Sequence, residues 1–175
     1  NMYNYDVSLQ TLKLGISGDY TVKSSDELYG NHSMLNKLVA AYSEIAKGTK
    51  TLIFNNGINT SRYVCEIFKK AGYNIRHLDN KNNASERKEI LKWFKETPDA
   101  ILTSVSILTT GFDEPSVETI ILNRATRSLT LYFQMIGRGS RYLPHKENFN
   151  VIDMGNNVAR FGLWNAGIDW QEIFH

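Results

Sequence analysis

Short apolar runs alternate with longer amphipathic stretches through most of this 175-residue chain. Runs such as 51–54 and 119–122 are short and largely apolar, which is typical of buried strands. The stretch from Met34 instead repeats apolar residues at helical spacing. Parallel strands need crossover connections, and these are usually helices. The alternation therefore predicts an α/β fold, in which a mainly parallel sheet carries helices on both faces in a three-layer sandwich.

Turn-forming and capping residues bound the expected elements. Gly48 and Gly72 are placed to end two of the helices, and Pro98 ends a third. Asn83, with Glu86 three residues later, resembles a capping box. We expect strands at 51–54, 75–78, 100–103, 119–122 and 151–153, and helices from 34, before 72, after 83 and over 128–137.

The length of the chain suits one compact domain better than two ordinary domains. Residues 1–32 are rich in Asn, Asp, Ser and Tyr and show little periodicity. We interpret them as an interdomain linker or edge segment, and not as the start of the core. Residues 33–160 are expected to form the domain, and residues 161–175 to begin a C-terminal extension.

Composition argues against several classes of protein. No apolar run approaches the ~18 residues of a membrane span, and the amino terminus lacks the order of a secretory signal, so we expect a cytoplasmic protein. The single cysteine, Cys65, excludes an internal disulfide framework and is interpreted as a small buried side chain. The histidines show no paired metal spacing, so we expect no metal site in this chain.

Positive charge is concentrated in one part of the chain. The formal net charge is only +2, but residues 119–146 contain no Asp or Glu. The basic residues in that stretch are Arg124, Arg127, Arg138, Arg141 and Lys146. Such segregation favours a phosphate-bearing partner, and the alternative is an ordinary solvated surface.

The most informative run, residues 134–141, reads QMIGRGSR and follows a predicted helix. Two arginines three residues apart, Arg138 and Arg141, stand among small residues that let a ligand approach closely. Arginine offers a permanent charge and a planar fork of donors suited to phosphate oxygens. The run predicts a phosphate-facing arginine pair, although two arginines that pair with carboxylates would give the same pattern.

A second polar run follows the strand expected at 100–103. Hydroxyls at Thr103 and Thr110 precede Gly111 and then Asp113. Hydroxyls and backbone amides at a strand end can hold a nucleic-acid phosphate, and a carboxylate near a nucleotide can accept hydrogen bonds from a ribose. The alternative is a simple turn in which Asp113 bonds its own backbone and Pro115 fixes the chain direction.

Together, these two runs resemble motifs V and VI of superfamily 2 helicases of the DEAD/DEAH-box type. Residues 51–56 resemble motif IV, and Ser85-Glu86-Arg87 before Phe94 resembles the helix that lies between motifs IV and V in that family. The resemblance covers residues 51–153 and implies the C-terminal, second RecA-like domain of a helicase. Residues 128–134 and 153–157 are most similar to bacterial DNA-repair helicases and restriction-type translocases.

The resemblance implies roles on the ATP side of such a domain. Arg138 and Arg141 match the two motif VI arginines that reach the γ-phosphate of ATP, and Gln134 matches the polar residue that opens that motif. Asp113 matches the motif V carboxylate near the ribose, with Gly111 beside it.

The resemblance also implies contacts with the nucleic-acid backbone. Thr103 and Thr110 match the hydroxyl-bearing part of motif V, and Asn55 and Asn56 end the motif IV match. Met135 stands where DEAD-box RNA helicases usually have arginine, which favours DNA over RNA. Arg160 lies outside the matched motifs, so we expect its replacement by alanine to be nearly neutral.

Two parts that hold ATP in this family are missing from the sequence. There is no Gly-x-x-x-x-Gly-Lys-Ser/Thr loop, and neither Asp26-Glu27 nor Asp113-Glu114 follows the apolar strand expected before a magnesium-binding pair. We therefore expect ATP and Mg²⁺ to be held mainly by a preceding RecA-like domain, and this fragment to be inactive alone. The hypothesis is an ATP-dependent nucleic-acid helicase, with a double-strand DNA translocase subunit and an inert RecA-like binding module as alternatives.

Overall fold

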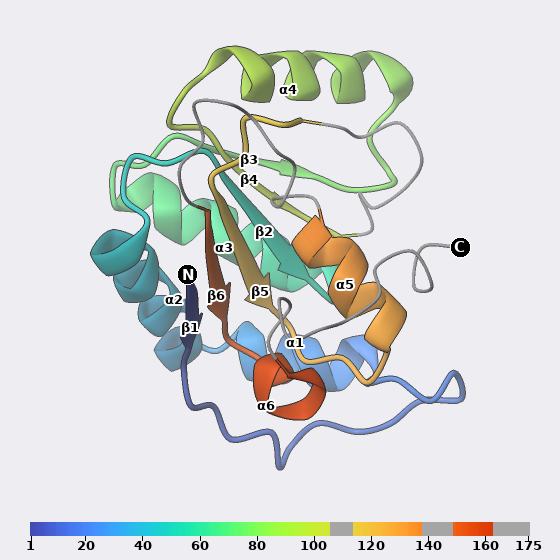
Figure 1. Cartoon of the computed structure of the whole chain (residues 1–175). Coiled ribbons are helices and arrows are strands. Elements are labelled where there is room, and N and C mark those ends of the chain that lie inside the picture. Colours follow the sequence, from blue (N-terminus) through green and yellow to red (C-terminus); the bar gives the residue numbers. More distant parts are fainter. Residues whose placement is uncertain (106–113, 138–148, 163–175) are drawn as a thin grey trace.

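The structure, a computed structural model, describes residues 1–105, 114–137 and 149–162. Within these residues one sheet has the strand order β1-β6-β5-β2-β4-β3, and every neighbouring pair is parallel. The strands all point toward the edge where α1 and α6 lie (Figure 1). The strands are β1 (Met2–Asn4), β2 (Thr51–Asn55), β3 (Ile75–Leu78), β4 (Ile101–Ser104), β5 (Thr119–Asn123) and β6 (Asn150–Asp153). The expectation of a mainly parallel sheet is confirmed.

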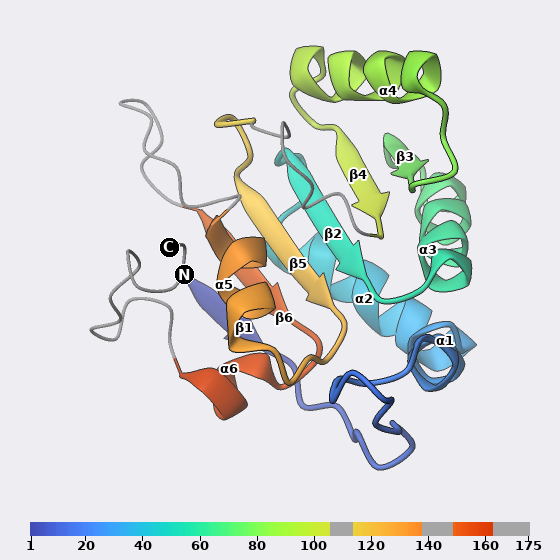
Figure 2. The same cartoon turned by 90° about the vertical axis from the view of Figure 1, so that its right-hand side faces the viewer.

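Helices cover both faces of this sheet. Helices α2 and α3 pack on one face, whereas α4 and α5 pack on the other (Figure 2). The helices are α1 (Val22–Tyr29), α2 (His32–Ile45), α3 (Ile58–Lys70), α4 (Ala84–Glu96), α5 (Leu129–Gly137) and α6 (Asn157–Phe161). Among the described residues, none of these helices is long and apolar enough to cross a membrane.

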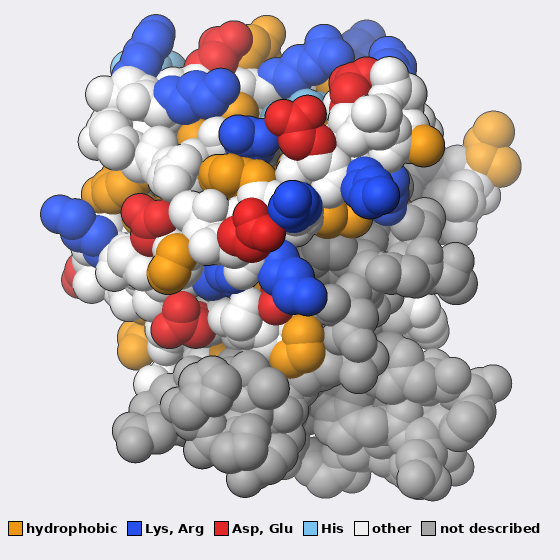
Figure 3. Space-filling model, turned by 90° about the horizontal axis from the view of Figure 1, so that it is seen from above, with side chains coloured by type: hydrophobic (Ala, Val, Ile, Leu, Met, Phe, Trp, Pro, Cys, Tyr) orange, Lys and Arg blue, Asp and Glu red, His pale blue; other side chains and the backbone are white. Residues whose placement is uncertain are grey.

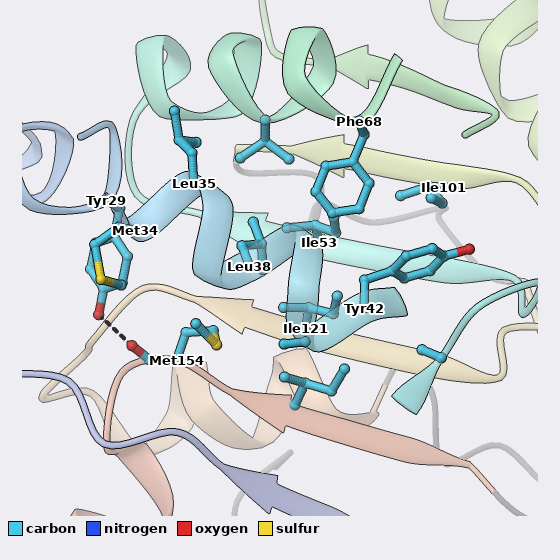
Figure 4. Close-up of a cluster of buried hydrophobic side chains, with 14 of the residues drawn as sticks. Tyr29, Met34, Leu35, Leu38, Tyr42, Ile53, Phe68, Ile101, Ile121 and Met154 are labelled. Atoms are coloured by element: carbon cyan, nitrogen blue, oxygen red, sulfur yellow. Dashed lines mark hydrogen bonds between the residues drawn. The ribbon is translucent and has the colours of Figure 1, made fainter. Parts of the chain in front are cut away.

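Alternation along the buried strands divides the interior into two cores. In β2, Ile53 faces the core under α2 and α3, whereas Leu52 and Phe54 face the core under α4 and α5. Successive side chains of a strand point to opposite faces, so the middle of a strand that is covered on both sides is mostly apolar. Figure 4 shows the first core, where Leu38 and Phe68 pack with Ile53.

The helix ends follow the capping signals in the sequence. The Asn83 side chain accepts a hydrogen bond of 2.8 Å from the amide of Glu86, which is one of the two bonds of the predicted capping box, while the Glu86 carboxylate accepts from the Asn82 side chain at 3.1 Å. Gly48 and Gly72 follow α2 and α3 with φ of +85° and +89°, a backbone region that favours glycine. Cys65 on α3 is buried, as expected, and burial raises the pKa of its thiol.

The first 32 residues differ from the expectation. Strand β1 adds to the edge of the sheet beside β6, which fits the edge alternative, but α1 was not anticipated. Val7 and Tyr29 are both buried members of the core, so it was wrong to interpret this segment as lying outside the core. The Tyr29 hydroxyl donates to the carbonyl of Met154 at 2.9 Å (Figure 4). This packing could not be predicted from an apolar pattern, because α1 carries few apolar residues and two of its buried residues are serines.

Candidate nucleotide and nucleic-acid interface

The carboxyl ends of the central strands carry polar residues. In open α/β sheets, ligands bind outside this edge because the loops that leave the strands gather there. Strands β2, β4 and β5 end in Asn55, Ser104 and Asn123, each at most 2% exposed. Asn55 is directly opposite Asn123 in the register of the sheet.

A hydrogen-bonded bridge joins these three strand ends. The Asn55 side-chain amide donates to Thr103 Oγ1 at 2.9 Å and to the Ser104 carbonyl at 3.2 Å. The Asn123 amide donates in turn to Asn55 Oδ1 at 2.8 Å. Because buried amides are costly to leave unpaired, this bridge fixes the edge of the sheet.

The bridge continues toward β3 through a serine, a histidine and an aspartate. Ser61 Oγ lies 2.9 Å from Thr103 Oγ1 and 2.7 Å from His77 Nδ1, and His77 Nε2 lies 2.6 Å from Asp79 Oδ2. Burial works to raise the pKa of the Asp79 carboxyl, but hydrogen bonds from His77 and the Lys81 amide outweigh it, so this pKa is lowered. Ser61 is 0% exposed and beyond the reach of a substrate, so the trio orders the loop after β3 rather than acting as a nucleophile.

Asn55 and Thr103 face inward in this arrangement. Both side chains are buried, and they bond to each other and to their neighbours. Their direct contact with nucleic acid stays a prediction. A ligand at this edge would first meet the loops that the two residues support.

Asn56 lies at the wall of an open cavity of about 370 Å³ at the same edge. Its side chain donates to the Tyr20 carbonyl at 3.1 Å and to Ser25 Oγ at 2.8 Å, so it also ties α1 to the end of β2. The residues around the cavity are Val22, Asp26, Asn56, Gly57, Ile58, Asn59, Arg62, Asn80, Lys81 and Val105. Two cations, Arg62 and Lys81, therefore border a polar hollow at the start of α3.

An aspartate from α1 caps α3 at one side of this cavity. Asp26 Oδ1 accepts hydrogen bonds from the Thr60 amide at 3.2 Å and from the Thr60 hydroxyl at 2.5 Å. A Cβ atom at Gly57 would lie 2.0 Å from Asp26 Oδ1, so a larger residue here would displace the Asp26 carboxylate. A carboxylate at a helix N-terminus is favourable because it meets unpaired amides and the positive end of the helix dipole.

Helix α5 leads into the predicted arginine pair. Its first turn begins where Ser128 Oγ accepts a hydrogen bond of 3.1 Å from the Leu131 amide. Met135 is buried in the core, and Gln134 is half-buried near the end of the helix. The predicted site residues Arg138, Arg141, Gly111, Asp113 and Thr110 lie outside the described residues.

The face that carries α4 has a different character. Basic and acidic side chains are mixed across it (Figure 3), and α4 itself alternates Lys88, Lys92 and Lys95 with Glu86, Glu89 and Glu96. Charges of both signs at close spacing give little net attraction for phosphate. The polar edge around Arg62 and Lys81 is the better candidate for nucleic acid.

The sequence analysis did not identify Arg62, Lys81 or the hydrogen-bonded trio that includes His77 and Asp79. A positional signal was available for Lys81, which lies in the loop directly after the strand predicted at 75–78, where an α/β sheet places its ligands. Arg62 lies farther from its strand, within α3. No signal in the sequence indicated that Asp26 caps the start of α3. This residue comes from a helix that the sequence did not reveal.

Comparisons with known proteins point to one family. The model of the helicase conserved C-terminal domain matches residues 31–142. A "51.5 kDa protein" of a Lactococcus phage is 30% identical over 168 residues, 95% of this chain and 37% of the relative. The "putative mitochondrial ATP-dependent helicase irc3" of Schizosaccharomyces pombe is 32% identical over 115 residues, 66% of this chain and 19% of the relative.

A solved structure with a similar fold is a fragment of a putative HsdR subunit of a type I restriction enzyme from Vibrio vulnificus, with a TM-score of 0.62 and 23% identity. The match covers 75% of this chain and 28% of that one. The chain spans little more than a third of the phage relative and a smaller share of the yeast one. The fold is that of a RecA-like domain. The chain belongs to the family of helicase conserved C-terminal domains, the second RecA-like domain of superfamily 2 helicases.

Proposed function

We propose that this chain is the C-terminal motor domain of an ATP-dependent DNA helicase. It supplies Arg138 and Arg141 to ATP bound on a preceding RecA-like domain and contacts the nucleic-acid backbone at the carboxyl edge of its sheet. The observation that carries the proposal is the cavity at that edge, where Arg62 and Lys81 border the start of α3.

The chemistry of this cavity suits the phosphate backbone. Arg62 offers a planar fork of donors and Lys81 a compact positive charge, and both groups match phosphate oxygens. Contacts of this kind position a strand without reading its bases, so binding would be independent of sequence. The buried bridge from Asn55 to Asp79 would hold the two flanking loops at a fixed separation.

The proposed ATP chemistry depends on residues that follow α5. Closure of the two domains would bring Arg138 and Arg141 onto the γ-phosphate, where charge spreads over the transferring oxygens. Gln134, Gly111 and Asp113 would line the same cleft, with Asp113 near the ribose. The preceding domain would hold most of ATP and Mg²⁺, so turnover and domain movement would be coupled.

We propose DNA as the substrate because Met135 replaces an arginine usual in DEAD-box RNA helicases. We propose DNA repair as the setting because residues 128–134 and 153–157 resemble bacterial DNA-repair helicases. A fluorescence assay of strand separation with the complete protein, run on matched DNA and RNA duplexes, tests the choice. ATP-driven unwinding of DNA would support a DNA helicase. A second assay would follow the ATP-driven displacement of a third strand from a DNA triplex, and displacement without separation of the duplex strands would indicate a double-strand translocase. Unwinding of RNA alone would contradict the choice of DNA.

The chain alone should hydrolyse ATP no faster than a buffer blank. It lacks the phosphate loop and the acidic pair that hold ATP and Mg²⁺ in this family. Phosphate release would be measured with ATP, Mg²⁺ and either single-stranded or duplex DNA. Arg141→Ala serves as a control, because turnover that comes from this chain and not from a contaminant should depend on that residue. DNA-stimulated turnover that disappears in Arg141→Ala would show that the chain is catalytically complete.

The chain should bind single-stranded DNA weakly and with a steep dependence on salt. Each phosphate contact releases counterions, so replacing Arg62 or Lys81 by alanine should lower the slope of log K against log[salt] by about 0.7. Lys92→Ala on α4 is the matched control and should leave the slope unchanged. The slopes would be measured by fluorescence anisotropy. If the Arg62→Ala and Lys81→Ala variants keep the wild-type slope, as the Lys92→Ala control should, the cavity is excluded as the binding site.

A further inference from the structure

The loop between β5 and α5, residues 124–128, is held by side chains that come from beyond β6. Asn157 Oδ1 accepts a hydrogen bond of 3.0 Å from the Thr126 amide, and Asn157 Nδ2 donates to the Arg124 carbonyl at 2.8 Å. Arg160 Nη1 donates to the Thr126 carbonyl at 2.6 Å. Two side chains therefore satisfy three backbone groups of a loop about thirty residues away in sequence.

A buried aspartate anchors the Asn157 side chain and the turn around it to the sheet. Asp153, at the end of β6, accepts hydrogen bonds from Asn157 Nδ2 at 3.0 Å, from the Gly155 amide at 3.0 Å and from the Val158 amide at 2.7 Å. It is 0% exposed, and burial raises the pKa of its carboxyl. The turn after β6 thus has a fixed internal geometry.

An aspartate from the N-terminal segment also binds the 124–128 loop. Asp19 accepts hydrogen bonds from the Thr126 hydroxyl and, at 2.9 Å, from the Arg127 amide, and Arg124 Nη2 lies 3.8 Å from Asp19 Oδ2. Burial works to raise the pKa of Asp19, but these hydrogen bonds outweigh it and lower that pKa. Thr126 Oγ1 also accepts from the Ser128 amide at 3.0 Å, directly before α5.

Helix α6 also contacts α5 itself. The Tyr132 hydroxyl donates to the Gly162 carbonyl at 3.0 Å, and the rings of Tyr132 and Phe161 stack with centroids 5.2 Å apart. The turn approaches the loop so closely that a Cβ atom at Gly155 would lie 2.1 Å from the Arg124 carbonyl oxygen. Backbone at that distance leaves no room for even one methyl group.

We propose that two elements, helix α6 and the turn that joins β6 to α6, form a brace that sets the position of α5. Asp153, Asn157 and Arg160 are positioning residues of this brace. They act through the 124–128 loop on the segment that carries Arg138 and Arg141. The link to ATP turnover rests on the proposed function of that segment, whereas the brace itself rests on the contacts above.

Arg160 is the most specific member of the brace. One guanidinium reaches three acceptors: the Thr126 carbonyl, Asn157 Oδ1 at 3.1 Å and the Gly155 carbonyl at 3.4 Å. A lysine could occupy one of these positions but could not span the set with a planar fork. Arg160→Lys should therefore restore only part of the effect of Arg160→Ala.

Hydrogen exchange of the chain alone tests the brace without ATP. In Arg160→Ala and Gly155→Ala, the amides of α5 should exchange at least ~10-fold faster, which corresponds to about 1.4 kcal/mol of local opening. Arg76→Ala is the matched control, since Arg76 packs 4.7 Å over the Trp93 ring near the opposite sheet edge. Unchanged α5 exchange in both brace variants, or equal acceleration in Arg76→Ala, would overturn the proposal.

Steady-state kinetics of the complete protein test the link to catalysis. Arg160→Ala should lower kcat by roughly 10- to 100-fold with little change in KM for ATP, because a displacement of about 1 Å at a reacting group can cost ~100-fold. If Arg141→Ala abolishes turnover while Arg160→Ala leaves it intact, the positioning role fails. If Arg141→Ala itself leaves turnover intact, the proposed function fails instead.

Discussion

Arg141→Ala in the complete protein is expected to lower nucleic-acid-stimulated ATP turnover by about 10³- to 10⁵-fold. Negative charge spreads over the γ-phosphate oxygens during phosphoryl transfer, and an arginine supplied to it contributes a factor of that size. This is equivalent to ~4 to 7 kcal/mol of transition-state stabilisation. ATP binding should change little, because the proposed preceding domain holds most of the nucleotide. Turnover by phosphate release and affinity by a fluorescent ATP analogue measure the two effects separately.

Two further variants sharpen this result. Arg141→Lys should recover only part of the rate, because lysine restores the charge without the bidentate fork. Arg138→Ala should resemble Arg141→Ala. Normal turnover in both alanine variants would show that Arg138 and Arg141 are not the arginines that reach the γ-phosphate, and the assignment of motif VI would be wrong.

The control for these variants must lie far from the proposed site. Arg160, which the sequence marks as neutral because it lies outside the motifs, is unsuitable. Its guanidinium donates to the Thr126 carbonyl and to Asn157 Oδ1, so we expect its removal to disturb the loop before α5. Arg76, stacked over Trp93, is an arginine of similar burial near the other sheet edge and should leave turnover near wild type.

The sequence predicted strands β2 to β6 and helices α2 to α5 because their signals are local. Leu52, Ile53 and Phe54 form a short apolar run, and such a run is typical of a strand covered on both faces. Asn83 with Glu86 predicted the start of α4 because a capping box is a contact between neighbours in sequence. Where one residue's conformation depends on adjacent residues alone, pattern and structure agree.

The contacts that organise the carboxyl edge are not local, and the sequence could not predict them. Asp19 reaches the Thr126 hydroxyl and Asp26 reaches Thr60, across 107 and 34 residues of chain. Each of these aspartates stands in a polar stretch that is indistinguishable from a solvated linker. Their roles became visible only when the fold brought the partner groups together.

The sequence places candidate residues at the ends of the strands, but it does not show which way their side chains point. Asn55 and Asn56 are neighbours with the same chemistry. Asn55 continues the buried register of β2 opposite Asn123, whereas Asn56 lies beyond the strand at the wall of the cavity. Which of two adjacent amides faces inward depends on where the strand ends, and end positions are the least certain part of a sequence pattern.

The inward orientation gives Asn55 a large expected effect on stability. Asn55→Ala removes two donors and one acceptor from the buried bridge and leaves the Asn123 amide and the Ser104 carbonyl without this partner. Each buried group left unsatisfied costs about 1 to 3 kcal/mol, so the loss of a partner for two groups should lower the free energy of unfolding by about 2 to 6 kcal/mol. Urea denaturation measures the change as a lower midpoint at constant slope.

A second substitution shows whether that loss comes from the bridge. Asn123→Ala should also destabilise the chain, and the double variant should lose less than the two single variants together, because residues in one hydrogen-bond network couple by about 0.5 to 3 kcal/mol. Asn36→Ala on the exposed side of α2 is the matched control and should be neutral or slightly stabilising, since alanine is the better helix former. DNA affinity, measured where Asn55→Ala is still folded, should fall less than in Arg62→Ala. A variant of full stability that loses DNA binding would instead assign Asn55 to the ligand, because a residue that only supports the edge cannot be removed without a cost in folding.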